Sequence, residues 1–122
     1  KVREVANEVF GDDNKIKLID PLEVIDFHNF LAKSYLILTD SGGIQEEAPT
    51  LGKPVLVTRN ETERQEGVAN GFSFLVGTNK QKIFDKATDI LDNFKGFINT
   101  KNPYGDGLAC KKIAETLKQL NK

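Results

Sequence analysis

The four residues Asp40-Ser41-Gly42-Gly43 combine a hydroxyl group with two positions that carry no side chain. They follow the apolar run 35–39 and precede a segment with helical character, so we expect a helix that begins at the carboxyl end of a strand. The unpaired N–H groups of such a helix N-terminus and the positive end of its dipole suit a phosphate or diphosphate. Glycine allows the close approach of an anion because it has no Cβ atom. From the residues alone, a tight turn with a serine cap explains the motif equally well.

Two glutamates follow this glycine turn on the expected helix. Glu47 is four residues after Gly43 and therefore shares the helix face that looks toward the anion site. A carboxylate at that depth can accept hydrogen bonds from two vicinal hydroxyls of a ribose, as the acidic residue of dinucleotide-binding folds does. Glu46 points about 100° away, since an α-helix has 3.6 residues per turn. We expect Glu46 to face solvent.

Two further candidates follow other expected strands at the same rim of the sheet. The guanidinium of Arg64 is able to reach a diphosphate from there, and a surface ion pair with Glu61 or Glu63 is the alternative. Phe27 offers a ring that can stack on a nucleobase, and a place in the core is the alternative. His28 is the single histidine, and we expect it at the surface or near a base edge rather than in catalysis.

Composition restricts the class of protein. The 122 residues, 39% hydrophobic and 29% charged, fit one soluble globular domain. A formal net charge of −1 gives no basic surface for nucleic acid or an anionic membrane, and no apolar run approaches the roughly 20 residues of a membrane span. The single cysteine, Cys110, excludes an internal disulfide and argues against a zinc site, so we expect a cytoplasmic protein. Because the chain opens at Lys1 directly into a helical pattern, we expect a fragment of a longer protein.

The elements that must position these residues alternate regularly. Apolar, β-rich runs begin roughly every 19 residues, at 16–19, 35–39, 54–58 and 72–76. Helical patterns cover 1–10, 26–33 (with Asp26 as N-cap), 43–51, 64–69, 80–94 and 108–120. This alternation predicts βα units, hence an α/β fold with a Rossmann-like parallel sheet of at least four strands and helices on both faces.

Four blocks of sequence, in this order, resemble the non-hydrolysing UDP-N-acetylglucosamine 2-epimerases: LTDSGGIQEEAP at 38–49, LGKPVLV at 51–57, TER at 62–64 and NPYGDG at 102–107. The resemblance covers nearly the whole chain. It implies the glycosyltransferase-B architecture, in which two Rossmann-like halves face each other across a cleft. In that arrangement residues 1–122 are a single UDP-binding domain from the C-terminal half of a two-domain enzyme.

The resemblance also implies roles for individual residues. They are Ser41, Gly42 and Gly43 for the diphosphate, Glu47 for the ribose, Arg64 for the phosphate side of the nucleotide, Phe27 against uracil, and the Leu22 backbone near the base edge. Relatives can carry Gln at position 22, where this chain has Leu. No metal ion and no cofactor are expected.

The implied reaction interconverts UDP-N-acetylglucosamine and UDP-N-acetylmannosamine by elimination and re-addition of UDP. The groups that transfer the proton belong to the family's N-terminal half or to residues before this chain, so we expect no catalytic residue in this fragment and no turnover by it alone. The missing N-terminal domain and a second copy, in a homodimer, are the expected partners. Alternatives are a UDP-sugar glycosyltransferase, a hydrolysing epimerase and, from a different class, a non-enzymatic flavodoxin-like domain.

Overall fold

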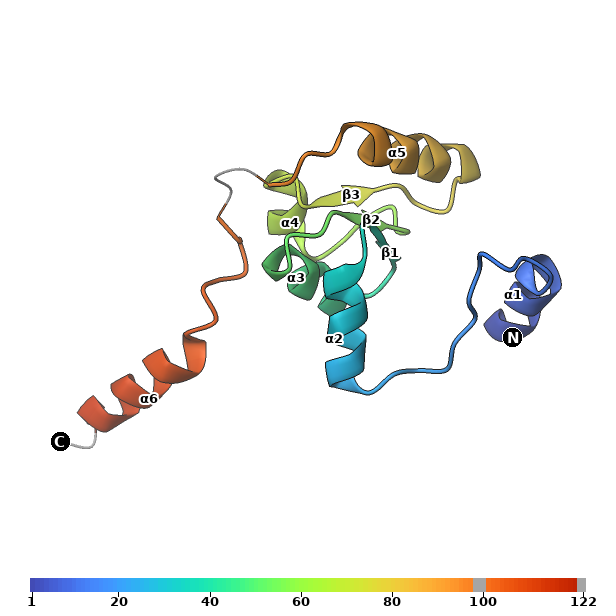
Figure 1. Ribbon diagram of the computed structural model, residues 1–122. Coiled ribbons are helices and arrows are strands. Elements are labelled where there is room, and N and C mark those ends of the chain that lie inside the picture. The colour runs from blue at the N-terminus through green and yellow to red at the C-terminus, as the bar shows by residue number, and fades with distance from the viewer. Residues whose placement is uncertain (98–100, 121–122) are drawn as a thin grey trace.

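A computed structural model describes residues 1–97 and 101–120 of the chain (Figure 1). Six helices and three strands alternate along these ranges. No helix among them is long and apolar enough to cross a membrane. In chain order the elements are α1 (Val2–Phe10), α2 (Val24–Lys33), β1 (Ile37–Thr39), α3 (Gly42–Thr50), β2 (Val55–Val57), α4 (Gln65–Ala69), β3 (Ser73–Leu75), α5 (Lys80–Asn93) and α6 (Ala109–Leu120).

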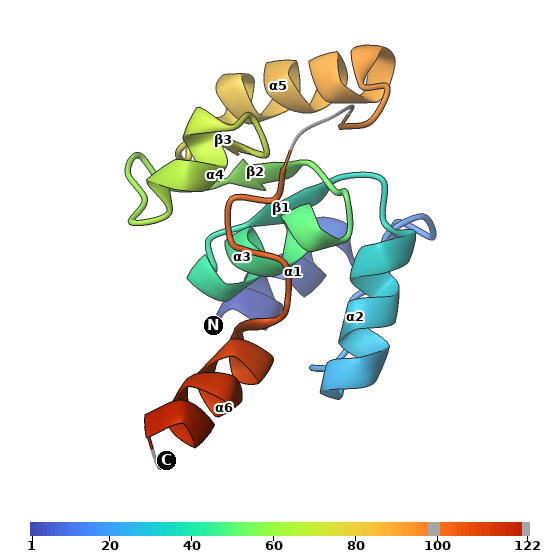
Figure 2. The same cartoon turned by 90° about the vertical axis from the view of Figure 1, so that its left-hand side faces the viewer.

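The three strands form one parallel sheet in the order β1-β2-β3. Its central strand, β2, is buried along its whole length because helices cover both faces. Val55 and Val57 point into a cluster with Leu31 of α2 and Ala48 of α3, whereas Leu56 points to the other face. There it packs in a cluster with Val76, which directly follows β3, and with Ile90 of α5. Figures 1 and 2 show α5 on one side of the sheet and α2 and α3 on the other. The predicted α/β class, parallel pairing and two-sided cover are confirmed.

The prediction of at least four strands is wrong for the described residues. Residues 16–19 form no strand, and Figure 1 shows this stretch in the connection between α1 and α2, away from the sheet. A strand exists only where a neighbouring strand pairs with its backbone N–H and C=O groups, and no strand of the described ranges lies beside this one. Ile16, Leu18 and Ile19 are accordingly exposed.

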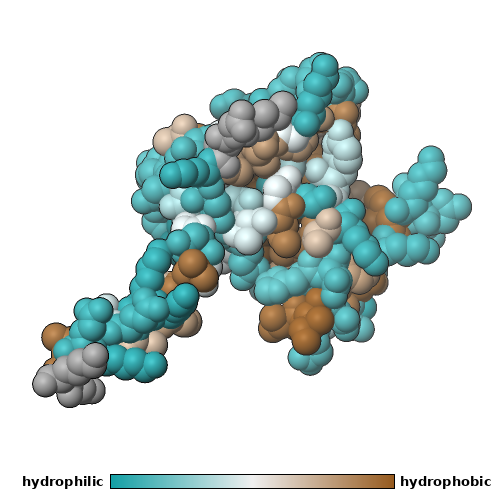
Figure 3. Space-filling model, turned by 60° about the vertical axis from the view of Figure 1, so that its left-hand side comes forward, coloured by the Kyte–Doolittle hydropathy of each residue, from teal (hydrophilic) through white to brown (hydrophobic). Residues whose placement is uncertain are grey.

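One helix start and several apolar faces refine the expectations. α2 begins earlier than predicted, at Val24, with Glu23 rather than Asp26 as its N-cap. α1 and α6 lie away from the sheet in Figure 1, and neither helix contains a buried residue. Figure 3 shows hydrophobic surface over the first turn of α2, where Val24 and Ile25 are exposed. The periodicity that identifies these helices therefore does not by itself decide whether their apolar faces are covered.

The turn from α3 into β2 depends on one glycine. Gly52 has φ 67°, its N–H donates to the carbonyl of Pro49 at 3.0 Å, and the N–H of Lys53 donates to the carbonyl of Ala48 at 3.0 Å. Gly52 therefore ends α3 with a residue in the left-handed backbone conformation, and the two hydrogen bonds satisfy the last carbonyl groups of the helix. The chain can then enter the sheet at Val55.

We expect Gly52→Ala to lower the free energy of unfolding by about 1 kcal/mol, because a Cβ atom is unfavourable in the left-handed region. Nothing lies within 4 Å of that Cβ atom, so backbone conformation alone is tested. Urea denaturation followed by circular dichroism measures the change. A variant as stable as the parent protein would contradict this role of Gly52.

Candidate functional site

The glycine turn lies at the point where β1 ends and α3 begins. Ser41 is the N-cap of α3, with extended backbone angles, and its Oγ accepts a hydrogen bond from the N–H of Ile44 at 3.5 Å. Its own N–H donates to Oγ1 of Thr39 at 3.1 Å, which fixes the turn to the end of the strand. The serine cap therefore exists, with a long bond. The first N–H groups of α3 remain directed out of the helix N-terminus, the arrangement that attracts an anion.

The structure brings Arg64 directly against this turn. A Cβ atom placed on Gly42 would lie 3.3 Å from Cζ and 3.4 Å from Nη2 of Arg64, and 3.0 Å from Oε1 of Glu63. The same construction on Gly43 meets only Oγ of Ser41, at 3.9 Å. The guanidinium thus lies over the first residue of α3, where a larger residue than glycine would displace it. Arg64 and the glycine turn, predicted at one rim of the sheet, do meet there.

Two carboxylates hold Arg64 in this position. Its Nε donates to Oε1 of Glu46 at 2.6 Å, and its Nη1 donates to Oε1 of Glu63 at 2.7 Å. The hydrogen bond with Glu46 raises the pKa of the guanidinium. A backbone hydrogen bond and then the charges of Arg64 and Arg59 lower the pKa of Glu63. Glu63 therefore stays ionised, and a phosphate that reaches Arg64 has to share or replace carboxylate partners.

Glu46 faces solvent only in part, and it has a partner that the sequence did not indicate. Its side chain is half exposed, and its carboxylate is bound to Arg64 on the loop that leads into α4. Sequence reasoning could not foresee this partner, because the position of α4 relative to α3 depends on contacts between residues far apart in the chain. The pair with Glu63, one of the alternatives for Arg64, is present alongside it.

Glu47 points to the opposite neighbour of α3. Its Oε2 lies 3.1 Å from Nε2 of His28 on α2, and both side chains are about half exposed. A small cavity of about 190 Å³ lies beside this pair and is lined also by Thr50 and Leu51. Consecutive glutamates of one helix therefore reach toward Arg64 on one side and toward α2 on the other.

Phe27 and Leu22 lie at the α2 side of the molecule. Phe27 is partly buried and packs against the core cluster under α2 and α3, and its ring centroid is 6.3 Å from that of His28. Leu22, just before α2, is also partly covered. The core position, one of the two alternatives for Phe27, is thus occupied, with part of the ring left accessible next to His28. No hydrogen bond or packing contact described above joins Phe27 or Leu22 to the guanidinium of Arg64.

The block NPYGDG at 102–107 folds back onto α3 and the start of α4. Asn102 donates through Nδ2 to Oγ1 of Thr50 at 2.8 Å and accepts through Oδ1 from the N–H of Tyr104 at 3.0 Å. The hydroxyl of Tyr104 donates to the carbonyl of Arg64 at 3.4 Å, and burial raises the pKa of this phenol. A groove of about 490 Å³ remains between α3 and this segment, with Glu46 and Glu47 in its wall. Sequence reasoning did not assign Tyr104 to the site. The signal that could have identified it is its position within the block 102–107.

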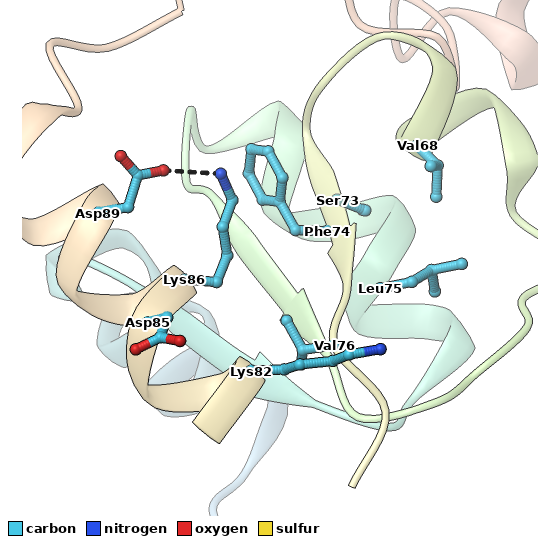
Figure 4. Close-up of a pocket in the computed structure, with 9 residues that line it drawn as sticks. All are labelled: Val68, Ser73, Phe74, Leu75, Val76, Lys82, Asp85, Lys86 and Asp89. Atoms are coloured by element: carbon cyan, nitrogen blue, oxygen red, sulfur yellow. Dashed lines mark hydrogen bonds and ion pairs between the residues drawn. The ribbon is translucent and has the colours of Figure 1, made fainter. Parts of the chain in front are cut away.

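A larger hollow lies elsewhere and is not the candidate site. It measures about 730 Å³ between β3 and α5 (Figure 4) and contains none of the predicted ligand residues. One of its two lysines, Lys86, is paired with Asp89 at 2.8 Å and lies 4.4 Å from the ring centroid of Phe74. The side chain of Ser73, also in its wall, is buried without a hydrogen-bond partner in the described residues. In those same ranges no three His, Cys, Asp or Glu side chains gather as a metal site.

The chain is similar to known proteins in both sequence and structure. The family model described as UDP-N-acetylglucosamine 2-epimerase matches residues 1–118. The Bacillus subtilis (strain 168) UDP-N-acetylglucosamine 2-epimerase is 56% identical over 119 residues, which are 95% of this chain and 31% of the relative. The S. aureus MnaA-UDP co-structure superposes with a TM-score of 0.88 at 51% identity, covering 98% of this chain and 33% of that one.

A second solved structure, UDP-GlcNAc 2-epimerase from Neisseria meningitidis bound to UDP-GlcNAc, superposes with a TM-score of 0.85 at 44% identity. The match covers 97% of this chain and 33% of that one. The chain therefore spans about a third of the length of the relatives it matches.

Proposed function

This chain belongs to the UDP-N-acetylglucosamine 2-epimerase family, and from that premise we propose that it forms the UDP-binding domain of such an enzyme. The observation that carries the proposal is the guanidinium of Arg64 against Gly42, at the N-terminus of α3. A helix N-terminus and a guanidinium aimed at one point provide backbone donors and a cationic fork for the same anion. The S. aureus relative was solved with UDP, which supports a nucleoside diphosphate as that anion.

The proposed site extends from the turn to α2. Ser41, Gly42 and Gly43 bind the diphosphate together with Arg64. Glu47 accepts hydrogen bonds from the ribose hydroxyls, which its position one turn into α3 supports. Phe27 contacts the uracil ring with its accessible part, and the backbone of Leu22 lies near the base edge. The contact between His28 and Glu47 supports this assignment, because it holds the Glu47 carboxylate beside α2, where this proposal puts the nucleoside.

For the whole enzyme we propose the family reaction, the interconversion of UDP-N-acetylglucosamine and UDP-N-acetylmannosamine by elimination and re-addition of UDP. Backbone N–H groups and Arg64 stabilise the negative charge that develops on the diphosphate when the bond to the sugar breaks. The Neisseria relative, solved with UDP-GlcNAc, supports this substrate class. In this proposal the chain is the C-terminal half of a glycosyltransferase-B fold in a cytoplasmic homodimer. Proton transfer at the sugar belongs to residues outside this chain.

Titration with UDP, UMP and inorganic phosphate tests the binding function. We expect affinity to fall in that order, because UMP reaches Glu47 with its ribose but lacks the second phosphate group, and inorganic phosphate reaches only the turn and Arg64. Isothermal titration calorimetry on the 122-residue chain gives the three constants. Equal affinity for the three ligands would contradict a nucleotide site and favour a simple anion site, as in the flavodoxin-like alternative.

Product analysis tests the reaction. The protein as its gene encodes it is expected to convert UDP-N-acetylglucosamine into UDP-N-acetylmannosamine without an acceptor, whereas the 122-residue chain is expected to produce none. Release of free N-acetylmannosamine would indicate the hydrolysing epimerase, and a requirement for an acceptor sugar would indicate a glycosyltransferase.

A further inference from the structure

A buried pair of polar side chains connects the glycine turn to the loop that carries Arg64. Gln45 of α3 is completely buried, and Thr62, two residues before Arg64, is 5% exposed. The hydroxyl of Thr62 donates to Oε1 of Gln45 at 2.7 Å. Burying these groups is costly unless their polar atoms are bonded, so the pair has to keep its geometry in the folded protein.

The two outer ends of this pair are bound to main-chain atoms of the proposed site. Nε2 of Gln45 donates to the carbonyl of Ser41 at 3.2 Å. Oγ1 of Thr62 accepts a hydrogen bond from the N–H of Arg64 at 3.1 Å. Three consecutive hydrogen bonds therefore run from the backbone of Ser41 to the backbone of Arg64. On its other side, the carbonyl of Arg64 accepts the hydroxyl of Tyr104 at 3.4 Å, so the main chain of Arg64 is held at both its polar atoms.

This relay of three hydrogen bonds sets the separation between the glycine turn and the main chain of Arg64. Binding of one anion by both depends on that separation. The guanidinium can bridge to a ligand on the glycine turn only if the main chain at position 64 stays close to α3. Hydrogen bonds set that separation more narrowly than apolar contacts do, because they weaken steeply with length and angle. Gln45 and Thr62 are themselves too deeply buried to touch a nucleotide.

We propose that Gln45 and Thr62 are positioning residues that hold Arg64 in register with the diphosphate-binding turn. The inference rests on the proposed function and deepens it, since it names what aligns the two halves of the anion site. A purely structural role for the pair would lower the stability of the protein and leave the ligand preference of the folded protein unchanged.

Two substitutions of Thr62 separate these roles. Thr62→Val keeps the shape and removes the hydroxyl, whereas Thr62→Ser keeps the hydroxyl. We expect Thr62→Val to weaken UDP binding about tenfold and Thr62→Ser to restore it to within about twofold of the parent protein. Affinity for uridine, which has no phosphate, is expected to be the same in all three proteins. Thr88→Val, at an exposed position of α5, is the matched control and is expected to change neither affinity.

Binding is measured by calorimetry for UDP and by ligand-observed NMR for uridine, on the protein as its gene encodes it. In an Arg64→Ala background, Thr62→Val is expected to cause no further loss of UDP affinity, because its effect passes through Arg64. If Thr62→Val is not folded at the assay temperature, Gln45→Met, which keeps the length of the side chain and removes the relay, is measured in the same way.

The outcomes are distinct. Loss of UDP affinity alone, rescued by serine and absent in the Arg64→Ala background, supports the positioning role. Equal loss for UDP and uridine, no loss for UDP, or a further loss without Arg64 would overturn it while leaving the UDP site in place. A parent protein that binds UDP no better than uridine would remove the proposed function and the inference with it.

Discussion

Replacing Arg64 with alanine is expected to weaken UDP binding by about a hundredfold. The guanidinium lies against Gly42 at the start of α3, so its loss removes the cationic fork at the proposed diphosphate position. Charge-assisted hydrogen bonds are roughly twice as strong as neutral ones, and a fork makes two of them. Arg64→Lys is expected to be intermediate, because an ammonium keeps the charge and loses the planar geometry. Calorimetric titration with UDP measures both variants.

Arg59→Ala is the matched control for this experiment. Arg59 has the same charge and also pairs with Glu63, at 3.2 Å, but its side chain is exposed. A loss of affinity caused by contact is expected in Arg64→Ala and not in Arg59→Ala. Similar losses of UDP affinity in both variants would show that only the overall electrostatic field of the protein matters. The assignment of Arg64 to the diphosphate would then be abandoned.

The carboxylates around Arg64 do not prevent this role. Glu46 and Glu63 are about half exposed, and ion pairs between exposed groups contribute little to stability because water screens them. A diphosphate that arrives at the turn has the backbone donors of α3 in addition to the guanidinium, so it competes well for Arg64. The two glutamates thus keep the guanidinium over the turn in the ligand-free protein.

Gly67→Ala is expected to lower the free energy of unfolding by about 2 kcal/mol, the cost typical of an overpacked core. Gly67 is buried in α4, and a Cβ atom there would lie 2.5 Å from the hydroxyl of Tyr104 and 3.1 Å from Oγ of Ser73. A tyrosine ring cannot withdraw locally, since its hydroxyl is the end of a rigid group. The segment 102–107 would have to move away from α3 and α4. Urea denaturation measures the loss.

Tyr104→Phe in the same chain tests the cause. Removing the hydroxyl takes away the 2.5 Å contact and leaves Cζ of the ring at 3.4 Å from the new Cβ atom. The double variant is therefore expected to recover most of the stability that Gly67→Ala loses. If the double variant is as unstable as Gly67→Ala alone, the close approach of Tyr104 to α4 is not the reason for glycine at position 67.

The site could be predicted in part, and the parts that could not depend on long-range packing. Local spacing placed Ser41 and Gly42 at the start of a helix, and Arg64 at the same rim of the sheet, because these follow from the order of strands and helices along the chain. Spacing did not show that Glu46 binds Arg64 or that Tyr104 holds its carbonyl, since the partners are 18 and 40 residues apart.

The sequence by itself identified the six helical segments, the parallel α/β class and the helix N-terminus at the glycine turn. Each of these depends on periodicity, capping and turn residues, which act within a few positions of the chain. Only the tertiary structure decided that residues 16–19 form no strand in the described ranges and that Gln45 and Thr62 join α3 to the loop before α4 through a buried hydrogen bond. Strand pairing and buried polar contacts need a partner from elsewhere in the chain, and the position of that partner is a property of the whole fold.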